Sequence, residues 1–146
     1  MSALLDLIRD LEDVDPIIKI QAAEKLQRLS SGDLSGLLPF KAKLMQLAGK
    51  ANQQEVRWHM AQLLPSLQLS AGEREDLKQL FISYLDDESY IVQISALKAL
   101  ADMALEDESI KPDVTQVLEE NLASGVPAIQ ARCKRLLFQL REESSY

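Results

Sequence analysis

The chain has 146 residues, of which 47% are hydrophobic and 27% are charged. This length corresponds to one domain, and this composition excludes disordered and fibrous proteins. Aromatic residues make up only 5% of the chain, and glycine and proline number five each, which favours helices over a β-sandwich or a barrel. A formal net charge of −7 argues against sequence-independent binding of nucleic acid, because that needs a basic surface.

Apolar side chains recur at helical spacing along the chain and predict eight helices in four antiparallel pairs, with no β-strand. The first helix of each pair is marked, in chain order, by Leu4, Leu5, Ile8 and Leu11; Leu37, Leu38, Leu44 and Leu47; Leu77, Leu80, Phe81 and Leu85; and Val114, Val117, Leu118 and Leu122. Asp15 and Pro16 provide an N-cap and a first-turn proline for the second helix. Pro39 lies early in the third helix, and Pro65 should kink or loosen the end of the fourth.

The second helix of each pair carries a repeated pattern. The four copies start at Ile18, Val56, Val92 and Ile129, which are 38, 36 and 37 residues apart. Counted from these starts, offset four holds Ala22, Met60, Ala96 and Cys133; offset eight holds Leu26, Leu64, Leu100 and Leu137; and offset eleven holds Leu29, Leu67, Met103 and Leu140. These offsets share one helix face, and a fixed period of this length is typical of a solenoid. We therefore predict one domain, residues 1–146, built of units 1–31, 32–70, 71–107 and 108–146.

The pattern of the second helices is an acidic turn, a valine followed by an arginine, small residues and then a leucine. Only Arg57 supplies the arginine; the other copies have Lys19, Gln93 and Gln130, and the fourth has Gly125-Val126-Pro127 in place of the acidic turn. The pattern is clearest in the segments Glu55-Val56-Arg57, Met60-Ala61 and Leu64. It returns with Asp86-Asp87-Glu88, Val92, Ala96-Leu97 and Leu100, and with Asp15, Ile18-Lys19, Ala22-Ala23 and Leu26. Over nearly the whole chain this resembles the HEAT-repeat family. The resemblance implies an all-α, right-handed superhelix whose second helices line a concave surface; armadillo repeats, the near alternative, are longer and add a third helix.

Offset two of the second helices is apolar in every unit and points away from the predicted core. It holds Ile20, Trp58, Ile94 and Ala131. In a HEAT-like array this row either packs between neighbouring repeats or forms an apolar stripe for a partner. Trp58 favours the second interpretation, because tryptophan is enriched at interface hot spots. We predict that Ile20, Trp58 and Ile94 anchor a protein or peptide, with Gln62 and Lys98 setting its orientation.

The acidic segment Asp86-Asp87-Glu88 is the densest charge cluster and the second candidate site. It could bind a cation or a basic partner, or it could cap the helix that follows. At the other end of the chain, Lys134 stands at offset five of the last helix, where the other units have Ala23, Ala61 and Leu97. With Arg132, Arg135 and Arg141 it gives that helix the polar outer face of a terminal repeat.

No catalytic constellation is evident in the sequence. The single histidine, His59, has no metal-ligand partners at a recognisable spacing, and the single cysteine, Cys133, falls in a core column as a small apolar residue. We expect no cofactor, no metal and no enzymatic activity. The resemblance leaves open a lyase subunit acting on bilins, a DNA-base glycosylase, or a structural subunit of a larger assembly.

The N-terminal residues contain no basic region followed by a long apolar core, so we expect no secretory signal. No stretch approaches about 18 consecutive apolar residues, so we expect no transmembrane helix. The sequence thus predicts a cytoplasmic scaffold or adaptor that binds a protein or peptide, and it does not indicate an oligomeric state.

Overall fold

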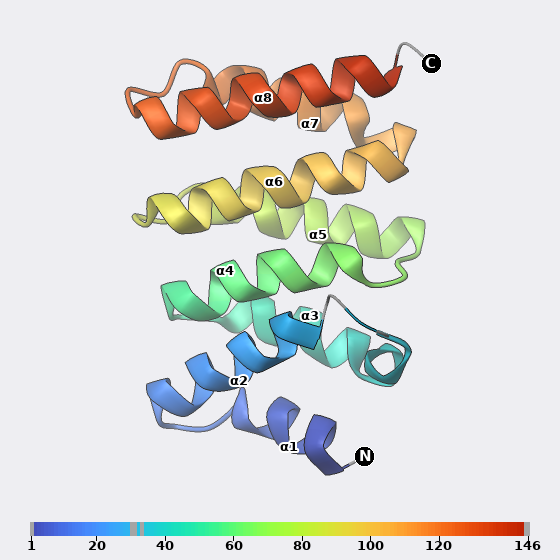
Figure 1. Cartoon of the computed structure of the whole chain (residues 1–146), viewed down its shortest axis with the longest axis vertical. Coiled ribbons are helices and arrows are strands. Elements are labelled where there is room, and N and C mark those ends of the chain that lie inside the picture. Colours follow the sequence, from blue (N-terminus) through green and yellow to red (C-terminus); the bar gives the residue numbers. More distant parts are fainter. Residues whose placement is uncertain (1, 30–31, 33, 145–146) are drawn as a thin grey trace. The chain divides into compact units, whose positions relative to one another are not determined.

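The computed structural model describes residues 2–29, 32 and 34–144. Every regular element in these residues is helical, which confirms the predicted all-α class (Figure 1). The α-helices are α1 (Ser2–Asp10), α2 (Pro16–Arg28), α3 (Lys41–Lys50), α4 (Gln54–Leu63), α5 (Ala71–Tyr84), α6 (Tyr90–Glu106), α7 (Lys111–Asn121) and α8 (Pro127–Ser144). Short 3-10 helices cover Ser35–Phe40, Leu64–Ser66 and Glu108–Ile110.

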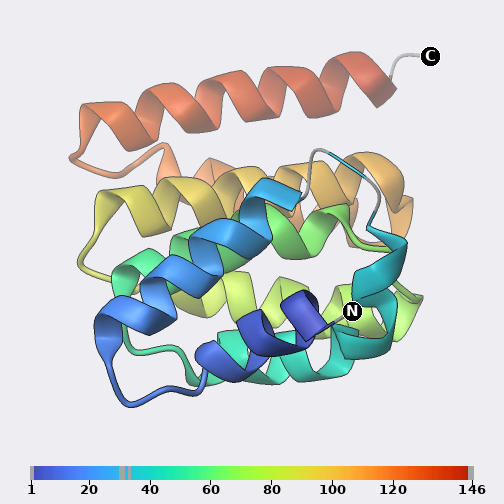
Figure 2. The same cartoon turned by 60° about the horizontal axis from the view of Figure 1, so that its bottom comes forward.

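The chain divides into two compact units, Met1–Ser70 and Ala71–Tyr146. The boundary between the two units, after Ser70, coincides with the predicted end of the second repeat. In the first unit, α1 packs on α2, and α2 lies beside α4; the hairpin of α1 and α2 comes forward in Figure 2. In the second unit, α5 packs on α6, α7 packs on α8, and α6 lies beside α8. Second helices are therefore neighbours within each unit, while the superhelix implied by the resemblance stays a prediction.

The repeated apolar columns form the core, as their spacing predicts. All the residues at offsets four and eight are buried, among them Met60 and Cys133, which are fully enclosed. Two predicted core residues of the first repeat are less covered: Ile18 is half-buried, and Leu29 is 40% exposed. Leu29 is the C-cap of α2 and directly follows its last residue, Arg28.

Three prolines, Pro16, Pro39 and Pro65, lie at helix starts or in short 3-10 helices next to α-helix ends. Pro16 is the first residue of α2, and Asp15 caps that helix by accepting a 2.9 Å hydrogen bond from the backbone N–H of Ile17. Pro65 lies in the 3-10 helix that follows α4, which confirms that it loosens this helix end. Pro39 lies within a 3-10 helix before α3, so the predicted third helix begins as a tighter turn. Proline lacks the N–H that a continuing α-helix needs.

Candidate functional site

The predicted row is partly covered in the first unit. Ile20 on α2 and Trp58 on α4 are both half-buried, whereas Gln62, one turn after Trp58, is exposed. Since α2 and α4 pack together, both helices bury part of their facing surfaces. The tryptophan ring lies next to the ring of His59, with 5.7 Å between centroids and a tilt of 55°. Part of the Trp58 side chain is therefore packed against its neighbours, and the rest is exposed to solvent.

His59 joins the same two helices through a polar contact. Its Nδ1 atom lies 3.2 Å from Oε1 of Gln27 on α2. Burial lowers the pKa of His59, and the carboxylates of Glu24 and Glu55 only partly oppose this effect. A lowered pKa favours the neutral imidazole. In this form His59 makes a hydrogen bond to Gln27 that connects α4 with α2.

In the second unit, the predicted residues lie on α6 next to an open groove. Ile94 is half-buried, and Lys98 is exposed. The groove lies between α6 and α8 and has a volume of about 430 Å³. Residues that line it include Lys98, Asp102 and Leu105 from α6 and Arg132, Arg135 and Phe138 from α8. The structure therefore brings one predicted site residue, Lys98, together with several that the prediction did not contain.

Two large apolar side chains of this groove are open to solvent. Phe138 is 62% exposed and Leu105 is 37% exposed, in a unit whose other apolar residues are mostly buried. The positions of both residues on this face could have been predicted from the sequence. Phe138 follows Ala131 by seven residues, and Leu105 follows Ile94 by eleven, so each continues the face on which the offset-two row begins. Extending the row along α6 and α8 would have found them.

The charges in the groove are unevenly paired. Lys98 Nζ binds Asp102 Oδ2 at 2.9 Å, one turn along α6, so these two charges largely satisfy each other. Among the residues that the structure describes, neither Arg132 nor Arg135 has an ion-pair partner. A second carboxylate, Glu142, also lines the groove, so its charged lining residues are three cations and two carboxylates, with a net charge of +1. The groove therefore presents two guanidinium groups beside an exposed aromatic ring, on a chain whose net charge is −7.

The acidic turn between α5 and α6 has a structural role at its centre. Asp87 Oδ1 accepts a 2.7 Å hydrogen bond from the backbone N–H of Ser89, and the Asp87 carbonyl accepts one from Gln93 Nε2. Ser89, which the sequence analysis missed, is the N-cap of α6 and binds the Val92 N–H. Asp86 and Glu88 are exposed on either side of this turn. These contacts account for Asp87 as a capping residue.

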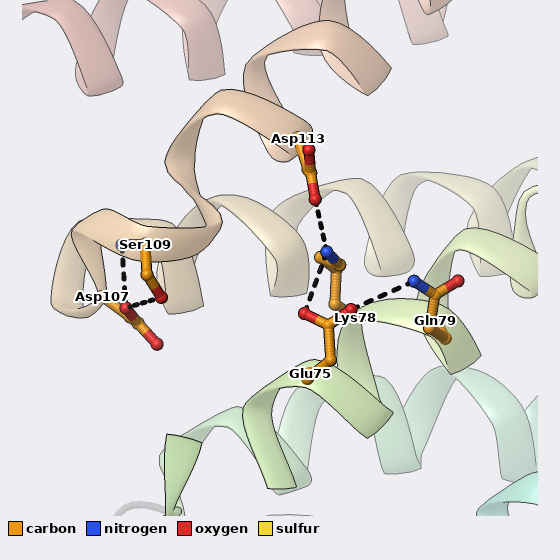
Figure 3. A network of polar contacts seen from close by, with 6 residues as sticks. All are labelled: Glu75, Lys78, Gln79, Asp107, Ser109 and Asp113. Carbon is orange, nitrogen blue, oxygen red and sulfur yellow. Dashed lines mark hydrogen bonds and ion pairs between the residues drawn. The ribbon is translucent and has the colours of Figure 1, made fainter. Parts of the chain in front are cut away.

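A polar network ties α5 to α7 on another part of the second unit (Figure 3). The ammonium group of Lys78, a buried side chain, lies 2.5 Å from Asp113 Oδ2 and 2.9 Å from Glu75 Oε2. Hydrogen bonds to these carboxylates raise the pKa of Lys78, and those from Lys78 and Gln79 lower the pKa of Glu75. The carboxylate partners of Lys78 come from α5 and α7, so the network acts as a structural clamp between these helices.

Asp107 anchors the segment before α7. Its Oδ1 accepts hydrogen bonds of 2.9 Å and 2.6 Å from the backbone N–H and hydroxyl of Ser109, which lower the pKa of Asp107 (Figure 3). Its other oxygen lies 3.6 Å from Arg74 Nη1 on α5. With the Lys78 network, this gives two links from α5 to the last hairpin.

Cys133 is fully buried, as its core column predicts, and burial raises the pKa of its thiol. In the part of the chain that the structure describes, no group of three or more His, Cys, Asp or Glu side chains is placed to hold a metal ion. None of the described helices is both long and apolar enough to cross a membrane.

The chain matches no protein-family model, no curated protein and no solved structure. The resemblance to HEAT repeats therefore rests on the residues quoted above.

Proposed function

We propose that this protein is a non-enzymatic interaction module, a scaffold or adaptor that binds a protein or peptide along its second helices. In this proposal the hairpins stack as a HEAT-like, right-handed superhelix. The observation that carries it is the groove between α6 and α8, where exposed Phe138 and Leu105 lie among charged side chains.

This composition matches the usual anatomy of a protein-binding surface. Interfaces place apolar and aromatic side chains at their centre and polar groups at the rim, with arginine enriched and lysine depleted. Covering an exposed phenylalanine is favourable by about 1.5–3 kcal/mol when burial is complete. An exposed aromatic ring rimmed by charges thus supports an anchor point for a partner in the second unit. The half-buried Ile20 and Trp58 are a separate candidate surface in the first unit.

Solubility gives a competing account of the charged residues on α8. A terminal repeat needs a polar outer face, and Lys134 and Arg141 fit that need because both are exposed outside the α6–α8 groove. A solubilising face does not explain Phe138, which places an apolar ring in solvent. The binding proposal accounts for the exposure of Phe138, and solubility accounts for Lys134 and Arg141.

The proposal is tested by affinity capture from a lysate of the source organism. The baits are the wild-type chain, Phe138→Ser, Trp58→Ala and the control Ile91→Ser, which removes an apolar side chain of similar exposure (56%) from the same unit. We expect a protein retained by wild type and Ile91→Ser but lost with Phe138→Ser. Circular dichroism establishes that each bait is folded. Equal retention by all four baits would contradict the proposed surface.

A further inference from the structure

We infer that the α6–α8 groove binds an acidic segment of a partner protein, with an apolar side chain on Phe138 and Leu105 and carboxylates on Arg132 and Arg135. The inference rests on the proposed function and specifies the chemistry of the partner.

The sign of the partner's charge follows from the pairing inside the groove. Lys98 and Asp102 bind each other, so their net contribution is small. Arg132 and Arg135 remain available among the described residues, and each lines the groove. Glu142 also lines the groove, so three cations and two carboxylates leave it a net charge of +1. An incoming carboxylate would meet two guanidinium groups without displacing an ion pair between described residues.

The identity of these cations also matters. The guanidinium group is planar and always charged, and it binds carboxylates through two parallel hydrogen bonds. Arg132 and Arg135 are three residues apart on α8, as are Arg135 and Phe138, so neighbouring turns of one helix present charge and an aromatic ring. A segment that alternates acidic and apolar side chains is complementary to this surface.

Another groove of the second unit shows the contrast. It has a similar volume, about 420 Å³, and lies between α7 and α8. Its basic side chains already face carboxylates, with Lys111 3.7 Å from Glu108 and Arg141 3.9 Å from Glu119. The α7–α8 groove therefore does not prefer a charge, whereas the α6–α8 groove does.

The size of the α6–α8 groove favours a short segment over a folded domain. A volume of about 430 Å³ is in the range of sites that enclose a few side chains. Nucleic acid would also offer anions, but the net charge of −7 opposes the approach of a long phosphate backbone. A short acidic peptide carries far fewer charges than a long phosphate backbone, so the same repulsion opposes its approach less.

A displayed library of random twelve-residue peptides, selected on the full-length wild-type chain, tests this inference. The selected peptides are then measured by fluorescence anisotropy against Arg135→Glu and against Lys134→Glu. The second variant makes the same charge change on the neighbouring, exposed residue outside the groove. A single-stranded DNA oligonucleotide serves as the alternative anion, and light scattering reports self-association.

We expect enrichment of peptides that combine aspartate or glutamate with leucine or an aromatic residue. Their affinity should fall at least tenfold with Arg135→Glu and less than threefold with Lys134→Glu, and it should weaken as salt is raised. Enrichment of neutral or basic peptides that are lost with Phe138→Ser would overturn the acidic partner while leaving the proposed function intact. Peptides indifferent to Phe138→Ser and Trp58→Ala would overturn both. Tighter binding of the oligonucleotide, or self-association through the groove, would also overturn the inference.

Discussion

The half-buried imidazole of His59 makes the stability of the folded chain depend on pH. Because burial lowers its pKa, the folded chain resists a proton that the unfolded chain accepts near pH 6.5. The contribution of His59 is thus fully present above the unfolded pKa and is lost as the pH falls through it. Glu24 and Glu55, which favour the charged form, and Arg28, which opposes it, set the size of this effect.

This predicts a pH dependence that a single substitution removes. His59 is the only histidine in the chain, so His59→Gln, which can still bond Gln27, should abolish most of the stability change between pH 7.5 and pH 5.5. Urea unfolding of both proteins at these two pH values measures the effect. An equal loss of stability on acidification in the variant would show that other groups are responsible.

At the residue scale, the sequence predicts burial well and exposure poorly. Cys133 and Met60 are enclosed because they occupy a column that repeats in every unit. Phe138 was not predicted as a site residue, because the offset-two row was not extended one further heptad along α8. Its 62% exposure depends on what lies beside α8 in space, which the spacing along one helix does not report.

At the scale of elements, the Lys78 network fixes α5 against α7. The buried ammonium group has two carboxylate partners, Glu75 and Asp113, which come from different helices. With one partner removed, Lys78 keeps the other; with both removed, a buried charge is left unpaired, which is far more costly. The two carboxylates are therefore expected to act non-additively.

We predict that Glu75→Gln and Asp113→Asn each destabilise the protein only modestly, since both carboxylates are half-exposed or more and Lys78 keeps its other partner. The double variant should lose clearly more than the sum, and Lys78→Met should be more stable than the double variant because it removes the buried charge itself. Urea unfolding of the four variants provides the comparison. Additive losses would mean that the ammonium group is not held by this pair.

The signs of the pKa shifts in this network predict the pH limits of the clamp. The pKa of Glu75 is lowered, so its contribution is present above its unfolded pKa near 4.5 and is lost as the pH falls. The pKa of Lys78 is raised, so its contribution is present below its unfolded pKa near 10.5 and is lost as the pH rises beyond it. The clamp is therefore stable throughout the neutral range.

Helix positions were predictable because apolar spacing and capping residues are local signals. Asp15 and Pro16 mark the start of α2, and Pro65 marks the end of α4. The acidic turn was harder to interpret, since a carboxylate that caps and a carboxylate that binds look alike in sequence. Only the contact from the Ser89 N–H shows that Asp87 caps.

For the whole molecule, the period of 36 to 38 residues predicts paired helices. The structure divides into two compact units, each with four α-helices in its described residues. The candidate site could be predicted only in part. Lys98 came from the row pattern, whereas the groove depends on the register of α6 against α8, which no residue spacing along one helix determines.

Site-specific photocrosslinking shows whether the α6–α8 groove contacts a partner protein. A photoreactive phenylalanine analogue replaces Phe138 in one version of the chain and Ile91 in the other, in cells of the source organism. Both side chains are more than half exposed, at 62% and 56%, so neither replacement disturbs the core. We predict a covalent adduct from position 138 that mass spectrometry maps to an acidic segment, that is absent from position 91, and that disappears with Arg135→Glu. Identical adducts from both positions, or none from position 138, would contradict the account.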